Sequence, residues 1–169
     1  GQGLLIGNAS GATVSGIHVY GGKVSGETGV AGLVGKAALY TTISGCSFDG
    51  EVTCTGDEYA AGIVGSTLTS TTVSACAFTG KITGDNTIGG IVSSTSSNAG
   101  AITDCHVNAD IKGKHTIGGI VGESMRAPIA NCHVEGTIEA TESPRWGGGP
   151  KAGGIVGELY PASSSTGTE

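Results

Sequence analysis

Cysteine has the widest chemistry of any residue type in this chain, because thiols form disulfides, bind metals and act as nucleophiles. Cys46, Cys76, Cys105 and Cys132 are separated by 30, 29 and 27 residues, and the CxxC pair of a zinc knuckle does not occur. This regular spacing predicts a reduced, buried ladder whose thiols pack as small hydrophobic groups. One or two disulfides between neighbouring thiols, or a bound metal, are the alternatives. The fifth cysteine, Cys54, is also predicted to face inward.

Three histidines follow the same interval. His18, His106 and His133 each come directly after a ladder position, so they should face solvent from a strand. His106 and His133 belong to neighbouring repeats, where two imidazoles could bind a transition metal or respond to pH. A solvated strand face explains them equally well, and we prefer that interpretation.

Carboxylates gather in the polar turns between the apolar segments. Asp57, Glu58 and Asp85 occupy corresponding turns, where an aspartate commonly hydrogen-bonds to its own backbone. Calcium held between adjacent turns, or a carboxylate pair acting on a glycan, is the functional alternative. The calcium-binding nonapeptide is absent from the sequence, so turn chemistry is the preferred interpretation.

Signatures of catalysis and of polyanion binding are missing. The sequence has no GxSxG, HExxH or GxxxxGK[ST] motif, and it predicts neither an enzyme nor a cofactor. Net charge is −6 and the eight Lys and Arg residues are scattered singly, which argues against nucleic acid as a partner. No apolar run approaches the roughly 18 residues that would span a bilayer, so membrane insertion is not expected.

An aromatic excursion near the C-terminal end is the best candidate for a contact site. The only tryptophan, Trp146, lies beside Arg145 among glycines, and Lys151 follows shortly after. An exposed indole of this kind could stack on a sugar or enter a protein groove. We therefore name Arg145, Trp146 and Lys151 as candidate ligand or partner contacts; the alternative is a long turn that folds back over the rest of the chain.

A recurring pentapeptide of glycine and aliphatic residues positions all of these side chains. Its first aliphatic residue recurs at intervals of 28, 30, 28, 29 and 35 residues, which identifies an internal repeat. The six members of this series are Leu5, Leu33, Ile63, Ile91, Ile120 and Ile155.

Each repeat offers three short apolar segments, rich in β-branched residues and separated by Gly, Ser, Thr, Asn and Asp. Segments of this length and composition predict strands, and helical spacing is not sustained anywhere. We therefore predict an all-β fold, a parallel β-solenoid in its right-handed form. It should have five to six coils of about 29 residues with three strands each, stacked about 4.8 Å apart.

The solenoid is predicted to occupy residues 1–160 as one domain, which we expect to be a fragment of a longer chain, and residues 161–169 are predicted to form a Ser/Thr-rich tail or linker. One question stays open within each coil. Strict alternation would expose one residue of every aliphatic pair and create an apolar stripe suited to association. A corner that turns both residues inward would remove this stripe, and we favour the corner.

The recurring G-[GA]-[LI]-V-G box, followed about 15 residues later by a short strand, resembles the GLUG motif. That motif occurs in repeat regions of large bacterial cell-surface and secreted proteins, some of them labelled IgA-peptidase-like. The resemblance runs from Gly3 to Tyr160, with Ser93 replacing the closing glycine in one copy. It implies a β-solenoid surface segment such as a stalk or adhesin, and it carries no protease active site onto any residue of this chain.

The expected function is that of a non-enzymatic structural or adhesive segment of a large bacterial surface or secreted protein, located outside the cell. Its partners would be neighbouring domains or like subunits, and a host glycan or protein. A glycan-binding or glycan-cleaving β-helix is the first alternative; it would require a cluster of carboxylates on one face, and the sequence pattern shows none. A subunit that assembles end to end into a fibre is the second, because open solenoid ends are exposed strand edges.

Overall fold

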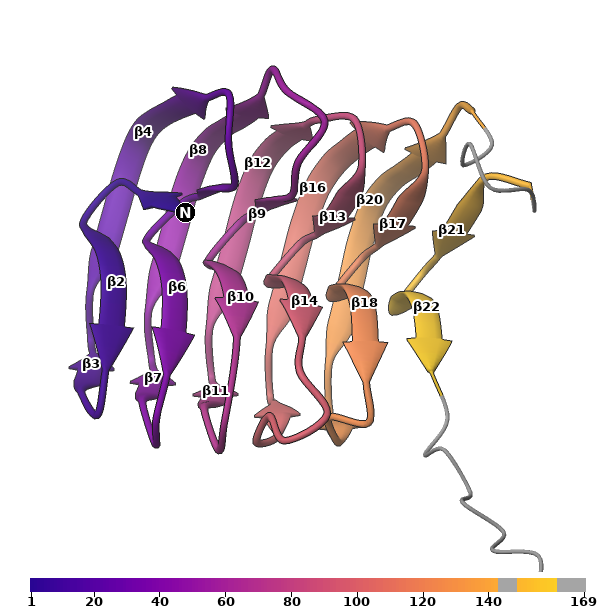
Figure 1. The fold of residues 1–169 in the computed structure, drawn as a ribbon. Helices are drawn as coiled ribbons and strands as arrows, with labels where there is room; N and C mark the ends of the chain where they lie inside the picture. The colour runs from indigo at the N-terminus through magenta and orange to yellow at the C-terminus, as the bar shows by residue number, and fades with distance from the viewer. Residues whose placement is uncertain (143–148, 161–169) are drawn as a thin grey trace, which may run out of the picture.

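The computed structural model describes residues 1–142 and 149–160, which form a parallel β-solenoid (Figure 1). Within these residues there is no helix, and hence none that could span a bilayer. The described residues form twenty-two strands in four parallel sheets that run along the solenoid, and each of the first five coils contributes one strand to each sheet. The all-β solenoid predicted from the repeat is confirmed. We call the sheets A, B, C and D in the order in which the chain meets them.

Sheets A and B contain six strands each. Sheet A consists of β1 (Gln2–Gly3), β5 (Val30–Ala31), β9 (Ala60–Ala61), β13 (Thr87–Gly89), β17 (Thr116–Gly118) and β21 (Lys151–Gly153). Sheet B consists of β2 (Ile6–Ser10), β6 (Val34–Ala38), β10 (Val64–Thr67), β14 (Val92–Thr95), β18 (Val121–Met125) and β22 (Val156–Tyr160).

Sheets C and D contain five strands each. Sheet C consists of β3 (Thr13–Ser15), β7 (Thr42–Ser44), β11 (Thr72–Ser74), β15 (Ile102–Thr103) and β19 (Ile129–Ala130). Sheet D consists of β4 (His18–Gly26), β8 (Ser47–Cys54), β12 (Ala77–Thr83), β16 (His106–Gly113) and β20 (His133–Ala140). The described part of the sixth coil, which ends at residue 160, therefore supplies strands to sheets A and B.

The chain has four strands per coil, where the sequence pattern predicted three. The difference arises at a sharp corner inside the second apolar segment of each repeat, which begins at Thr13 in the first repeat and which we expected to be one strand. One residue there has a left-handed backbone with φ between 50° and 64° in every coil, and this conformation ends the pleat. The corner residues are Gly16, Gly45, Ala75, Asp104 and Asn131. After the corner, the second half of that segment joins the next one to make the long strand of sheet D.

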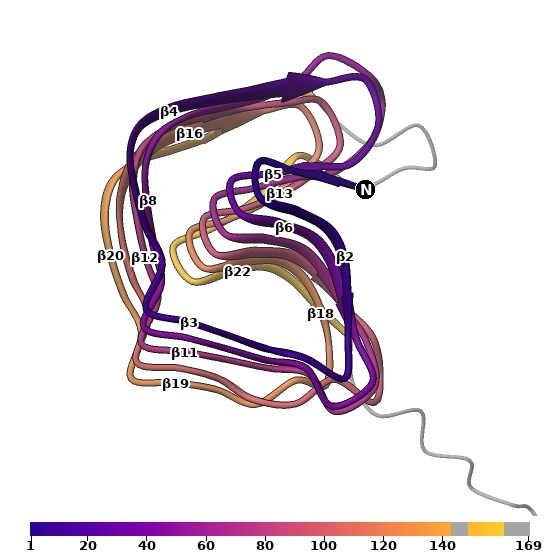
Figure 2. The ribbon, with the colours of Figure 1, turned by 90° about the vertical axis from the view of Figure 1, so that its left-hand side faces the viewer.

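The solenoid is right-handed. Seen from its N-terminal end, the chain runs clockwise through β2, β3, β4 and β5 as it moves away from the viewer (Figure 2). This is the hand that parallel crossover connections generally adopt.

Apolar columns that run from coil to coil form the core. In sheet D, Phe48 pairs in register with Phe78, and their rings stack with centroids 6.0 Å apart; Val107 and Val134 continue the column. All but the terminal member, Val134, are fully buried. In-register stacking of like side chains removes these columns from water, and this burial is the main force holding the coils together.

Candidate functional site

Sheets A and B meet at a bend where each coil folds in on itself (Figure 2). The bend lies at the pentapeptide: β5 ends at Ala31, Gly32 and Leu33 turn the chain, and β6 begins at Val34. The backbone approaches itself so closely here that a Cβ on Gly89 would lie 1.8 Å from the Val92 carbonyl oxygen. This approach requires glycine at Gly89, and equally at Gly118 and Gly153, where a Cβ would also lie 1.8 Å from a carbonyl oxygen. In two other coils the position is held by Ala31 and Ala61, which are fully buried.

Both residues of the aliphatic pair turn inward at this bend. Leu33 and Val34 are fully buried, as are the corresponding pairs that begin at Ile63, Ile91 and Ile120. The favoured interpretation, a corner that removes the apolar stripe, is therefore what the four inner coils show. Exposure of the first residue of the pair returns only in the end coils, where Leu5 is 48% and Ile155 38% exposed.

Ser93, the one exception to the closing glycine, is also accommodated by the bend. Its side chain is fully buried, and its hydroxyl donates a hydrogen bond to the Thr87 carbonyl oxygen at 2.9 Å. A buried hydroxyl is tolerated only with such a partner. The departure from the motif is therefore satisfied locally and leaves the stacking of the coils intact.

On its outer side the bend carries a cavity of about 280 Å³, which we call the A/B cavity. One of its boundaries is Tyr59, whose ring lies over Gly29 and Gly65: a Cβ on either glycine would lie 2.5 to 2.7 Å from a ring atom. The cavity is lined by Asp57, Glu58, Tyr59, Asn86, Thr87, Ser94 and Glu123.

Three carboxylates from two coils face this cavity, so two of the turn acids noted in the sequence do line a site. Asp57 and Glu58 precede β9, whereas Glu123 comes from β18. Burial, and then the nearby Glu158, raise the pKa of the Glu123 carboxyl, while Lys151 opposes the shift. Carboxyl, phenol, amide and hydroxyl groups that line one cavity can together donate to and accept from the hydroxyl groups of a ligand.

The third turn acid, Asp85, has a structural role. Its carboxylate accepts a hydrogen bond from the Lys114 ammonium at 2.7 Å, across one coil step. Hydrogen bonding to Asp85, and its negative charge, raise the pKa of Lys114. Asp85 therefore joins two coils and does not line the A/B cavity.

Of the proposed contact residues Arg145, Trp146 and Lys151, the structure places only the last. Lys151 begins β21 and forms an ion pair with Glu158 on β22, close to the A/B cavity. Arg145 and Trp146 lie outside the described residues, as does the predicted tail at 161–169. Their part in any contact stays a prediction.

The cysteine ladder lies directly after the left-handed corner, where sheet C gives way to sheet D. Cys46, Cys76 and Cys105 are each 1% exposed, and Cys132 in the last complete coil is partly exposed. All five cysteines of the chain are free thiols in this structure. Each ladder thiol donates a hydrogen bond to the carbonyl oxygen two residues earlier, at 3.2 to 3.3 Å. Burial raises the pKa of Cys46, and the neighbouring Cys76 thiol together with burial raises that of Cys105.

The histidines face solvent, as their position after the ladder predicts. His106 and His133 stack on neighbouring coils with ring centroids 5.2 Å apart. His133 also contacts the Glu135 carboxylate at 3.1 Å, and His18 hydrogen-bonds to Ser47 at 2.7 Å. No group of three or more metal-ligating side chains occurs in the part of the chain that the structure describes.

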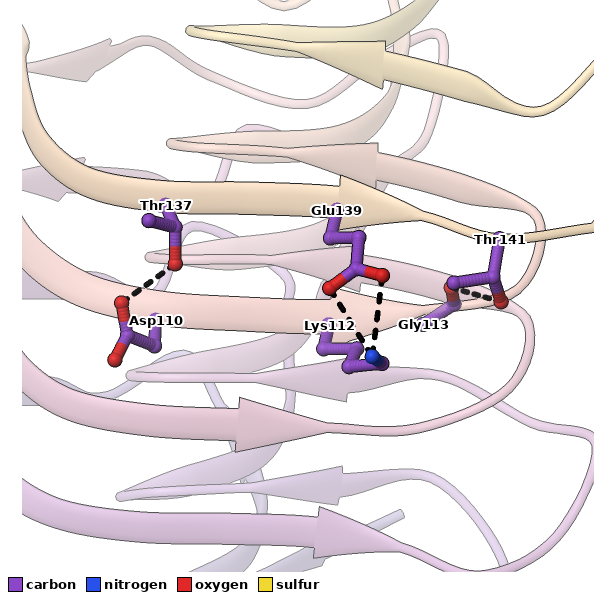
Figure 3. Close-up of polar contacts among 6 residues, drawn as sticks. All are labelled: Asp110, Lys112, Gly113, Thr137, Glu139 and Thr141. Atoms are coloured by element: carbon purple, nitrogen blue, oxygen red, sulfur yellow. Dashed lines mark hydrogen bonds and ion pairs between the residues drawn. The ribbon is translucent and has the colours of Figure 1, made fainter.

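The outer face of sheet D is held by polar contacts between coils (Figure 3). The Lys112 ammonium lies 3.1 Å from the Glu139 carboxylate, and the Thr137 hydroxyl donates to Asp110 at 2.5 Å. A third contact runs from the Thr141 hydroxyl to the Gly113 carbonyl oxygen at 3.1 Å. Exposed ion pairs of this kind contribute about 0 to 1 kcal/mol each, so they act more on the register of the coils than on their stability.

The principal residue that sequence reasoning missed is Glu123. It is 65 positions from Glu58, and alternation along a strand says nothing about the bend that brings both to one cavity. One feature of the sequence could have indicated Glu123. At its position in sheet B, the coils that carry Ser66 and Ser94 are followed by coils that carry Glu123 and Glu158. A change from hydroxyl to carboxylate at a fixed position of the repeat could have identified this end of the sheet.

Comparison with known proteins matches residues 26–53 to the model of the GLUG motif. This span is 28 residues long and runs from the end of β4 through β5, β6 and β7 to Thr53 in β8, so the motif corresponds to one coil of the solenoid. No curated protein and no solved structure matches the chain.

Proposed function

We propose that this chain is a structural and adhesive repeat segment of a large bacterial surface or secreted protein, acting outside the cell. The observation that supports this function is the contrast between the inside and the outside of the coils. Inward columns repeat the same kind of side chain, as in the series of Phe48, Phe78 and Val107. Outward columns change from coil to coil, as in the series of Ser47, Ala77 and His106.

Such a division suits a scaffold that presents a surface. The repeat fixes how coils stack, whereas the outer side chains are free of that constraint and can form contacts with a host glycan or protein. Neighbouring domains of the same polypeptide would attach at the ends of the solenoid. Nucleic acid is not a partner in this proposal, because the basic residues do not form a cluster. Membrane insertion is not part of it either, because no apolar run approaches the roughly 18 residues that would span a bilayer.

Binding without turnover is the experimental signature of this function. The 169-residue chain would be tested against arrays of host glycans and extracellular proteins, and the same glycans would be analysed for cleavage products after long incubation. We expect retention of at least one class of ligand and no new reducing ends. Clear turnover of a polysaccharide would contradict the structural and adhesive function.

The A/B cavity supports a second candidate function, a glycan-binding or glycan-cleaving β-helix. This function requires a cluster of carboxylates on one face, and Asp57, Glu58 and Glu123 line one cavity together with an aromatic ring. Carboxylates, an amide and hydroxyls are suited to hydrogen-bonding sugar hydroxyls, and a carboxyl with a raised pKa could act as a general acid.

Glu123→Gln tests this second function, because it removes the ionisable group while preserving size. Glu51→Gln is the matched control: Glu51 lies on the exposed face of sheet D, where it pairs with Lys23 at 3.1 Å. We expect Glu123→Gln to weaken glycan binding or cleavage at least about tenfold, as the loss of one good hydrogen bond to a charged group would. Equal behaviour of the two variants would remove the A/B cavity from consideration.

A further inference from the structure

Two rows of corresponding residues follow the bend between sheets A and B, where the A/B cavity lies (Figure 2). The rows arise because the strands of neighbouring coils pair in register. The row beside sheet A consists of Gly29, Tyr59, Thr87, Thr116 and Lys151. The row in sheet B consists of Lys36, Ser66, Ser94, Glu123 and Glu158.

Tyr59 is the aromatic member of these rows, and its ring extends from its own coil over the coil before it. A Cβ on Gly65, in the same coil as Tyr59, would lie 2.7 Å from a ring carbon. A Cβ on Gly29, one coil earlier, would lie 2.5 Å from the ring carbon that bears the hydroxyl. The ring therefore rests on two glycines, and it occupies the outer side of the bend at the second and third coils.

The A/B cavity extends from Tyr59 in the opposite direction along the rows. Asn86, Thr87 and Ser94 line it from the fourth coil and Glu123 from the fifth, whereas the ring reaches back to the second. Along the rows, the Tyr59 ring is therefore the boundary of the cavity on its N-terminal side.

The volume of the cavity, about 280 Å³, limits the size of its ligand. Pockets for drug-sized molecules measure about 300 to 1,000 Å³, so this one suits a single sugar ring rather than a stretch of several. The Asn86 amide and the Thr87 and Ser94 hydroxyls line it. Groups of these kinds donate hydrogen bonds to sugar hydroxyls and accept from them.

The charge of the lining restricts the ligand further. Three carboxyl groups line the cavity, and no lysine or arginine is among the lining residues that the structure describes. Lys151, whose charge acts on Glu123, is engaged in an ion pair with Glu158. A sugar that carries its own carboxylate would therefore be repelled, whereas a sugar without an acidic group would not.

We propose that the A/B cavity binds the terminal residue of a glycan chain, a residue without an acidic group, and that the Tyr59 ring is the wall at which the chain ends. An internal residue of a chain that lies along the rows is linked on both sides, so one of its neighbours would have to occupy the space of the ring. A terminal residue has one linkage and avoids this clash. This inference rests on the second candidate function, glycan binding at the cavity, and deepens it by naming the part of the glycan that is bound.

Pairs of glycans that differ by one capping sugar test the proposal. The probes are host oligosaccharides attached to an array through their reducing ends, each with and without one further sugar at the free end. We expect the wild type to bind at least one uncapped glycan whose terminal residue lacks an acidic group. The capping sugar should lower that affinity about tenfold or more, because it overlaps the Tyr59 ring.

Competition by free sugars shows whether one residue is sufficient for binding. Galactose, mannose, fucose and N-acetylgalactosamine serve as competitors, with N-acetylneuraminic acid as the acidic comparison. We expect the monosaccharide that matches the bound terminus to displace the glycan, and the acidic sugar to leave it in place.

Tyr59→Ala should abolish the discrimination between capped and uncapped glycans, because it clears the space that the capping sugar needs. We expect its affinities for the two members of a pair to agree within about threefold. Tyr59→Phe is the matched control: it keeps the ring that rests on Gly29 and Gly65, so it should still reject capped glycans.

Ser94→Trp tests the location of the site without altering Tyr59. The indole fills the cavity from the row in sheet B, so glycan binding should be lost. Thr79→Trp, at an exposed position of sheet D, is its control and should bind as the wild type does. If Tyr59→Ala fails to fold, the capped pairs and Ser94→Trp still decide the matter.

Equal binding of capped and uncapped glycans by the wild type overturns the proposal and leaves glycan binding at the cavity in place. A Ser94→Trp variant that binds as the wild type does also overturns it, because the glycan then lies elsewhere on the solenoid. Absence of binding to every glycan overturns both this proposal and the second candidate function. The array of extracellular proteins still tests the adhesive function in that case, so the failures are distinguishable.

Discussion

The inner coils and the end coils of this solenoid share one sequence pattern but differ in what surrounds it. Ile91, in the middle of the aliphatic column, is fully buried, whereas Ile155 at its end is 38% exposed. Gly90 is pressed against the next coil, whereas Gly154 meets open space. The same residue type therefore contributes differently to the free energy of unfolding at different positions along the solenoid. This contribution depends on whether a neighbouring coil covers the residue, and the local sequence does not determine it.

The largest difference in unfolding free energy is expected for the pentapeptide glycines that face the next coil. This column consists of Gly32, Gly62, Gly90, Gly119 and Gly154. Gly90→Val places a Cβ 2.0 Å from the Gly119 carbonyl oxygen and 2.9 Å from a Val107 methyl group, and the backbone cannot yield without separating two coils. We expect a loss of at least about 3 to 5 kcal/mol of unfolding free energy, or failure to fold. Gly154→Val should change it by less than about 0.5 kcal/mol. Urea unfolding at low protein concentration measures both, and equal losses would contradict the distinction between inner and end coils.

The aliphatic column should show a smaller difference of the same kind. Ile91→Ala leaves a cavity in the closed core, and we expect a loss of about 3 to 4 kcal/mol. Ile155→Ala removes a side chain that water already reaches, so its loss should be less than about 1 kcal/mol. Both values come from the same unfolding experiment. Comparable losses would mean that Ile155 is covered in solution, which the molar mass of the sample would reveal.

The cysteines allow inner and end coils to be compared by the rate at which their thiols react, in place of the free energy of unfolding. Cys132, in the last complete coil, is partly exposed, whereas Cys105 is 1% exposed and its pKa is raised by the Cys76 thiol and by burial. In the folded protein Cys132 should react with a thiol reagent at least about a hundredfold faster than Cys105, because Cys105 must wait for a local opening. Peptide mapping of the modified protein gives the rates. In denaturant all five thiols should react, and a lower count would indicate a disulfide.

The smallest expected effect concerns Glu123, which stacks on Glu158 at the end of sheet B where the middle coils carry Ser66 and Ser94. The pKa of Glu123 is raised by burial and then by Glu158, so the folded state holds this proton more tightly than the unfolded state. Stability should therefore fall as pH rises from the ordinary value of 4.5 through the raised pKa.

Glu123→Gln should remove that fall. The variant is expected to melt slightly higher than the wild type at neutral pH and at the same temperature well below pH 4.5, the ordinary value. Ser94→Gln supplies a control for the added amide in the middle of the same column. A variant that melts lower than the wild type at neutral pH would show that Glu123 stabilises the fold as a carboxylate.

Much of the fold could be predicted from the sequence, because in a solenoid one set of contacts is repeated. A column such as Phe48, Phe78 and Val107 recurs near every 29 residues, and only in-register stacking explains that interval. The corners were harder to place. Gly16 and Gly45 indicate a left-handed residue, but Ala75 and Asp104 adopt the same conformation because their neighbours on the stack impose it.

The candidate site was less predictable than the fold. Asp57 and Glu58 were identified as turn acids, yet their partner Glu123 reaches them only through the bend between sheets A and B. That bend depends on backbone approaches so close that a Cβ at its glycines would lie about 2 Å from a carbonyl oxygen, and strand alternation does not describe them. Ion pairs such as Lys114 with Asp85 likewise depend on which coils are neighbours and on how far each side chain reaches.

The uniformity of the coil junctions has a consequence for the length of the molecule. Residues 63–90 begin and end at the same point of the bend, so their removal would join Gly62 to Ile91 and recreate a junction that the solenoid already contains. Loss or duplication of such a segment in a gene would change the reach of the rod by about 4.8 Å and leave its cross-section as it was. Recombination between copies could therefore adjust the distance over which the protein acts, one coil at a time.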